Sequence, residues 1–136
     1  MTPPDHERGG GPAVEAAIVA GVLGLVLTFG IATMRLSLAE ATSDHAARAA
    51  ARVASVQRDP AGATAEATDA ARAVFQDRGI SCATVDVITT ADDGASVRAT
   101  VRCEVDWSDL VLPGAPGTYA VEATAVSVID RYREAS

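Results

Sequence analysis

Residues 11–34 read GPAVEAAIVAGVLGLVLTFGIATM, a long apolar stretch near the start of a 136-residue chain. No charged residue occurs from Ala16 to Met34. A helix that spans a bilayer needs about 20 consecutive, predominantly apolar residues, and this stretch supplies that length. The stretch therefore predicts a transmembrane helix, with one small domain formed by the residues that follow it.

A secretory signal peptide is the rival interpretation of the same stretch. The sequence Ala39-Glu40-Ala41 offers a small-x-small cleavage site for it. However, the apolar core of a signal peptide is only about 7–15 residues long and follows a positively charged segment. Here Asp5 and Glu7 accompany Arg8 before the stretch, so the sequence favours a retained membrane span.

Glu15 is the one acidic residue inside this apolar region, and it follows a glycine run, Gly9-Gly10-Gly11. A carboxylate in the hydrocarbon layer costs about 2.5–3.5 kcal/mol at the helix centre and less near its end. An ionisable group at such a position is a functional candidate. The alternative is an interfacial residue in the first helical turn, where a carboxylate interacts favourably with the helix dipole.

The arrangement from Arg8 onward, with glycines, Val14-Glu15 and an alanine-rich apolar run, resembles the signal of type IV prepilins. It is most similar to TadE-like proteins, which are minor pilins or pseudopilins of the tight-adherence (Flp) pilus system. The resemblance implies cleavage between Gly10 and Gly11 by a prepilin peptidase, or one residue further on. It also implies that Glu15, the fifth residue of the mature chain, pairs with the new α-amino group of a neighbouring subunit.

Small residues recur at a spacing of four along the apolar run, at Ala16, Ala20, Gly24 and Thr28. This spacing places them on one face of a helix. Small side chains let helices approach closely in lipid, so the face is a candidate for helix packing. Alanine is abundant in this chain, and chance is an equally good explanation of the row.

The composition argues against several classes of function. The net charge is −7, whereas binding to nucleic acid needs a basic surface. The two histidines, His6 and His45, are not part of any cluster with metal-site spacing. No phosphate loop, nucleophile elbow or histidine-containing triad occurs in the sequence. We therefore expect a non-enzymatic protein without a cofactor, a metal ion or a nucleic-acid partner.

The rest of the pattern predicts an α+β fold. A first helix is expected from about Ala13 to Gln57, because no helix breaker occurs in that range. Its domain-facing seam is expected to comprise Leu38, Thr42, His45, Ala49, Val53 and Val56. Asp59-Pro60 is expected to begin a second helix that ends at Gly79. The apolar face of the second helix comprises Ala63, Ala67, Ala70, Ala71, Val74 and Phe75.

Three antiparallel strands are expected after the helices, at residues 83–89, 96–107 and 118–129. The second strand is the clearest, since apolar residues from Val97 to Trp107 alternate with polar ones. This alternation indicates one buried and one solvated face. The turn Ala91-Asp92-Asp93-Gly94 joins the first two strands as a hairpin. The predicted fold is thus a long helix, a short helix and a three-stranded β-meander, similar to that of pilins.

Cys82 and Cys103 are the only cysteines, and we expect them to form a disulfide in an exported domain. A hairpin centred on Asp92-Asp93 would place Cys82 directly opposite Cys103. A three-residue turn with a glycine bulge would instead place Val85 opposite Val101, which matches the apolar faces better. The two registers differ by one residue, which a bulge near the strand end could absorb.

These observations predict a leader peptide at residues 1–10, a transmembrane segment at 11–35 and an extracytoplasmic α+β domain at 36–136. The resemblance implies a pseudopilin with a cytoplasmic amino terminus that assembles with other pilin-like subunits at the cell surface. Its expected partners are the lipid membrane, a prepilin peptidase and those subunits. One alternative is an unprocessed single-pass membrane protein with a small extracytoplasmic binding domain. Another is a secreted domain that begins at Thr42.

Overall fold

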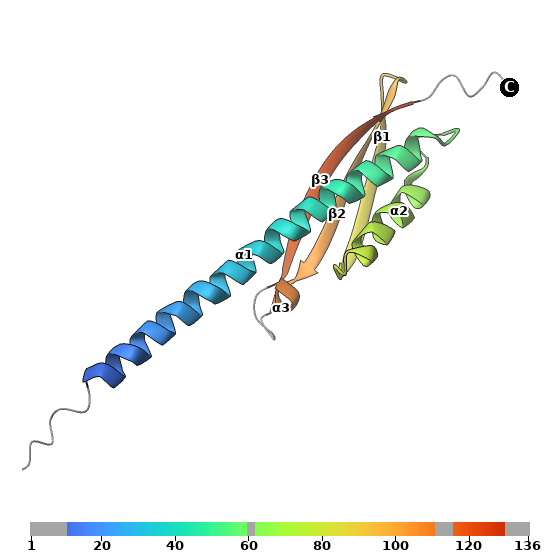
Figure 1. Cartoon of the computed structure of the whole chain (residues 1–136). Helices are drawn as coiled ribbons and strands as arrows, with labels where there is room; N and C mark the ends of the chain where they lie inside the picture. The colour runs from blue at the N-terminus through green and yellow to red at the C-terminus, as the bar shows by residue number, and fades with distance from the viewer. Residues whose placement is uncertain (1–10, 60–61, 111–115, 130–136) are drawn as a thin grey trace, which may run out of the picture.

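The structure is a computed structural model that describes residues 11–59, 62–110 and 116–129. It contains helices and one sheet in an α+β arrangement, as the sequence predicted (Figure 1). The elements are α1 (Gly11–Ser55), α2 (Thr64–Asp77), β1 (Thr84–Asp92), β2 (Ser96–Asp106), α3 (Trp107–Leu110) and β3 (Thr118–Val128). The predicted leader at residues 1–10, with Gly10, and the predicted helix-starting Pro60 lie outside the described residues.

Helix α1 has two parts with different surroundings. Its first 28 residues, 11–38, project away from the domain, and its remaining part lies along the sheet (Figure 1). Ala39 is the first buried residue of the helix. The residues that α1 buries are all small: Ala39, Thr42, Ser43, Ala46, Ala47, Ala50, Ala51, Ala54 and Ser55. Small side chains allow the helix backbone to lie close to the sheet, as the helix–sheet core requires.

The seam predicted for α1 was wrong in most of its positions. His45 is exposed, and Leu38 and Val56 are 49% and 56% exposed. Ala49 and Val53 are only partly buried, and Thr42 alone of the predicted set is fully buried. The larger apolar residues were expected to face the core. The contact surface is instead made of alanine, serine and threonine, since these small residues fit between α1 and the strands.

The sheet is an antiparallel meander in the order β1-β2-β3, as predicted. Its inner face packs against α1 and α2 and carries the alternating residues of β2, from Val97 to Val105. Its outer face is mainly polar and is not covered by either helix (Figure 1). The strand predicted to end at Trp107 ends at Asp106, and Trp107 begins the short helix α3.

Helix α2 supplies the largest buried side chain of the described domain, Phe75. Ala67, Ala71 and Phe75 form its fully buried face, as the sequence predicted. The helix begins at Thr64, later than the predicted start at Asp59-Pro60. Its end was predicted correctly. Gly79 has φ +67°, its N–H donates to the Gln76 carbonyl, and the Ile80 N–H donates to the Phe75 carbonyl, which is a Schellman cap.

The β1–β2 hairpin has a register that neither sequence-based alternative predicted. Val85 is the partner of Cys103 and Val87 is the partner of Val101. The apolar faces of β1 and β2 meet as predicted, but each residue of β1 pairs with a residue of β2 that is two positions further along than the three-residue turn would give. The reason is the turn, in which Asp93 and Gly94 have φ +50° and +63° and the Ala95 N–H donates to the Asp92 carbonyl. Two consecutive positive φ values are typical of a type I′ turn, so the turn begins later than predicted.

Candidate functional site

The first half of α1 presents apolar side chains that nothing in the described chain covers. Leu25, Phe29 and Met34 are 72%, 72% and 77% exposed. The other large exposed side chains of this segment are Val14, Ile18, Val19, Val22, Leu23, Val26, Leu27 and Ile31. The helix is long and apolar enough to cross a membrane, and a signal sequence near an amino terminus has the same properties. An apolar surface of this size is typical of a segment that lies in lipid.

Glu15 is the fifth residue of α1 and lies in this exposed apolar segment. The first turn of the helix contains no acidic residue, because α1 begins at Gly11, two residues earlier than predicted. The helix dipole acts mainly within the first turn, so it offers Glu15 less stabilisation than the sequence suggested. Within the described residues, Glu15 makes no ion pair and no side-chain hydrogen bond. Its carboxylate is therefore available to a group from another molecule.

The row of small residues lies on the same exposed segment. Ala16, Ala20, Gly24 and Thr28 are all exposed. The Thr28 hydroxyl donates to the Gly24 carbonyl at 2.8 Å, so its polar atom is satisfied within the helix. A Cβ added at Gly24 would meet nothing within 4 Å. No contact in the described chain thus requires glycine at this position. A helix of another subunit that packed closely against Gly24 would require it, because a larger side chain would keep the two helices apart.

Of the predicted processing site, Gly11 alone is described. It is the first residue of α1, and a Cβ added to it would meet nothing within 4 Å. The Gly10–Gly11 bond thus lies where the described helix begins.

The predicted disulfide is confirmed. Cys82 and Cys103 are bonded, with their Cα atoms 5.5 Å apart. Cys103 lies in the central strand and is 1% exposed, whereas Cys82 lies between α2 and β1. The Ala83 N–H donates to the carbonyl of Glu104, the residue that pairs with Thr84. The regular pairing of β1 and β2 ends at Thr84, and Cys82 lies outside it.

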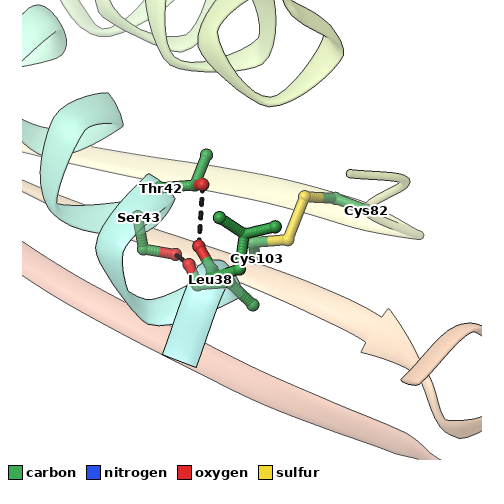
Figure 2. Close-up of a disulfide and its surroundings, with 6 residues drawn as sticks. Leu38, Thr42, Ser43, Cys82 and Cys103 are labelled. Carbon is green, nitrogen blue, oxygen red and sulfur yellow. Dashed lines mark hydrogen bonds between the residues drawn. A yellow bond between two sulfur atoms is a disulfide. The ribbon is translucent and has the colours of Figure 1, made fainter. Parts of the chain in front are cut away.

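The disulfide lies next to the part of α1 that enters the domain (Figure 2). Thr42 and Ser43 are buried there, and their hydroxyls donate to the carbonyls of Leu38 and Ala39 at 2.8 and 3.0 Å. Every buried side-chain nitrogen or oxygen atom of the described residues has a partner. The buried polar side chains at the junction between the projecting helix and the domain are therefore hydrogen-bonded, and the neighbouring disulfide cross-links the core.

A cavity of about 450 Å³ at this junction was not predicted from the sequence. It is lined by Arg35, Leu38, Ala39, Arg78, Gly79, Ile80, Ser81, Val105 and Ser108. These residues come from α1, the segment that follows α2, the end of β2 and α3, and only their assembly in the fold brings them together. The one sequence signal was Arg35, the first charged residue after the apolar run.

In the described residues, no group of three or more histidine, cysteine, aspartate or glutamate side chains could hold a metal ion. Comparison with protein-family models, with curated proteins and with solved structures gave no match to this chain. The assignment of a function therefore depends on the residues and geometry of the chain itself.

Proposed function

We propose that this chain is a TadE-like pseudopilin, a non-enzymatic membrane-anchored subunit that takes part in assembly of a tight-adherence (Flp) pilus. A prepilin peptidase cleaves it between Gly10 and Gly11. Helix α1 then remains in the membrane as its anchor and joins other pilin-like subunits. The observation that carries this proposal is the construction of α1, which is one uninterrupted helix with an exposed apolar half and a domain-packed half.

The proposed topology has the amino terminus in the cytoplasm and the disulfide-bonded domain outside. Disulfides form and persist in oxidising, extracytoplasmic compartments. The Cys82–Cys103 bond supports export of the domain, which lies at the carboxyl-terminal end of the apolar segment. The glycine–glutamate pattern supports the same orientation, since the family resemblance places a cytoplasmic leader before Gly11.

Glu15 is the proposed subunit-pairing residue. A buried carboxylate is costly in lipid unless an opposite charge compensates it. Cleavage before Gly11 creates an α-amino group, and that group on a neighbouring subunit is the proposed partner of Glu15. Glu15 is about 36 Å along the helix from Ala39, the first residue packed in the domain, at 1.5 Å per residue. Its pairing is therefore independent of the folding of the domain.

Site-specific crosslinking in membranes of the native host tests this role. Glu15→Leu makes the apolar segment longer, so the protein is expected to reach the membrane and to be cleaved. It should lose its crosslinks to other pilin-like subunits, because the neighbouring ammonium group has no carboxylate to pair with. Glu40→Leu is the matched control, as Glu40 is an exposed glutamate of α1 beyond the apolar segment. Wild-type crosslinking in Glu15→Leu would contradict the pairing.

A further inference from the structure

The cavity between α1, α2 and β2 lies where the projecting helix leaves the domain. Arg35, Leu38 and Ala39 contribute from α1, and Arg78 contributes from the residue that follows α2. Ser108 contributes from α3, which lies beside α1 at this point (Figure 1). The cavity is thus on the end of the domain that faces the apolar segment.

The length of the apolar run determines the height of this cavity above a bilayer. From Ala16 to Met34 the helix rises about 28 Å, which matches a hydrocarbon core about 30 Å thick. Ala39 lies a further 7 Å or so along the helix, at about 1.5 Å per residue. The polar headgroup layer on each side of the core is about 5–7 Å thick. With the run in the core, the cavity opens at the level of the headgroups.

The chemistry of the lining matches an anionic phospholipid headgroup. A guanidinium group presents five N–H donors in a fork that suits phosphate oxygens. Arg35 is already engaged in an interaction within the chain, so Arg78 is the arginine of the lining to which the phosphate is assigned. Ser81 and Ser108 add hydroxyl groups, while Leu38, Ile80 and Val105 supply apolar surface for the glycerol and upper acyl carbons.

Asp77 and Asp106 adjoin Arg78 and Val105 along the chain and are exposed, so any positive charge of the site comes from the lining itself. Among the described residues, the lining includes two arginines and no acidic residue. The end of α2 carries the negative end of a helix dipole, which disfavours an anion. Two of its carbonyls, those of Phe75 and Gln76, already accept hydrogen bonds from Ile80 and Gly79. Arg78, at the C-cap of α2, provides the opposite charge at that point.

The aromatic residues of this end are an independent sign of an interface with lipid. Trp107 and Tyr119 are in edge-to-face contact, with ring centroids 5.8 Å apart, and Trp107 is 37% exposed. The Trp107 N–H of the backbone donates to the Gly117 carbonyl at 3.0 Å, which fixes the residue next to Ser108. Tryptophan and tyrosine are enriched at the headgroup level of membrane proteins because one end of the ring is apolar and the other polar.

We infer that this cavity binds the headgroup of an anionic phospholipid, with Arg78 holding its phosphate, and so fixes the domain on the membrane surface. The inference rests on the membrane anchoring in the proposed function, and it does not depend on pilus assembly or on cleavage. It assigns phosphate binding to Arg78, which otherwise serves as the C-cap residue of α2.

Trp107, the only tryptophan of the chain, allows a direct test. The full chain is reconstituted in vesicles of phosphatidylcholine and phosphatidylglycerol, in which one lipid or the other carries bromine atoms near the headgroup. Both brominated lipids should quench Trp107, and at equal mole fractions brominated phosphatidylglycerol should quench it more. Arg78→Gln should lower this preference about fivefold. Arg78→Lys should keep most of the preference.

Arg58→Gln is the matched control, because Arg58 is exposed at the opposite end of α1 and lines a different depression. It should leave the preference unchanged. Equal quenching by the two lipids in the wild-type protein would overturn the headgroup site while leaving the anchor in place. Absence of quenching by either lipid would place Trp107 away from the bilayer and would overturn the headgroup site, whereas loss of the protein from the vesicles would overturn the anchor. Loss of the preference on addition of inorganic phosphate would assign the cavity to a soluble anion and overturn the lipid as its ligand.

Discussion

Cys82 is bonded to Cys103 of the central strand, although the strand partner of Cys103 is Val85 and not Cys82. The bond therefore connects the segment after α2 to the middle of the sheet, across a departure from the regular ladder at Ala83. It fixes the α2–β1 connection next to the point where α1 enters the domain (Figure 2). This cross-link joins two of the segments that line the arginine-containing cavity, the one after α2 and strand β2.

Removal of the disulfide should destabilise the domain without changing its fold. The bond joins residues 21 apart, and closing a loop of that size stabilises a protein by about 3 kcal/mol in the chain-entropy model. We expect Cys82→Ser/Cys103→Ser to lower the free energy of unfolding of the full chain by about that amount. Urea titration in detergent, followed by Trp107 fluorescence and circular dichroism, measures the change. An unchanged unfolding midpoint would show that the bond contributes nothing.

Phe75 should be the most costly single side chain to truncate. It is 2% exposed and is the largest buried residue of the described domain. Phe75→Ala should lower the free energy of unfolding by about 3–5 kcal/mol, since the small side chains around it cannot fill the space. Ile88→Ala is the control, as Ile88 is 64% exposed on the outer face of the sheet. Similar losses for the two variants would mean that the core is placed wrongly.

The helix–sheet contact gives a third prediction, for which neighbouring positions of α1 act as test and control. Ala47 is fully buried and His45 is exposed. Ala47→Leu should therefore overpack the core and lower the free energy of unfolding by about 1–3 kcal/mol. His45→Leu should leave stability nearly unchanged. If His45→Leu instead lowered stability more than Ala47→Leu, the result would support the seam that the sequence predicted.

The sequence was informative wherever contrast between residue types was strong. The apolar run predicted α1, and strict alternation from Val97 to Val105 predicted the central strand. Gly79 predicted the end of α2, since glycine adopts φ +67° without a steric penalty from a Cβ atom. The order of the meander followed from the short turn between β1 and β2. These features depend on local chemistry, which a sequence displays directly.

The sequence was uninformative wherever alanine occurs on all sides of a helix. Ala46 and Ala49 are the same residue type, yet one is fully buried and the other partly exposed. Only the position of the sheet decides between them. The prediction of the hairpin register was wrong for a related reason, because several turn types are compatible with Ala91-Asp92-Asp93-Gly94. Glu15 and the cysteines were found from the sequence, whereas the cavity was not, as its residues are distant along the chain.

The small-residue row of α1 gives a fourth prediction, which concerns association and not folding. Gly24→Leu places a large side chain where the described chain offers open space. The domain should keep its stability, because Gly24 makes no contact with it. Crosslinking between subunits in membranes should fall if helices pack along Ala16, Ala20, Gly24 and Thr28. Val26→Leu, on an exposed position outside the row, is the control and should leave crosslinking unchanged.

The central claim is that α1 is the helix of a processed pilin-like subunit. Amino-terminal sequencing of the protein from the membrane fraction of its native host tests it most directly. The account predicts a mature chain that begins at Gly11, or at Pro12 if cleavage occurs one residue later. A membrane protein that still begins at Met1 would indicate the unprocessed single-pass alternative. A chain that begins at Thr42 would indicate a secreted domain, and either result would contradict the account.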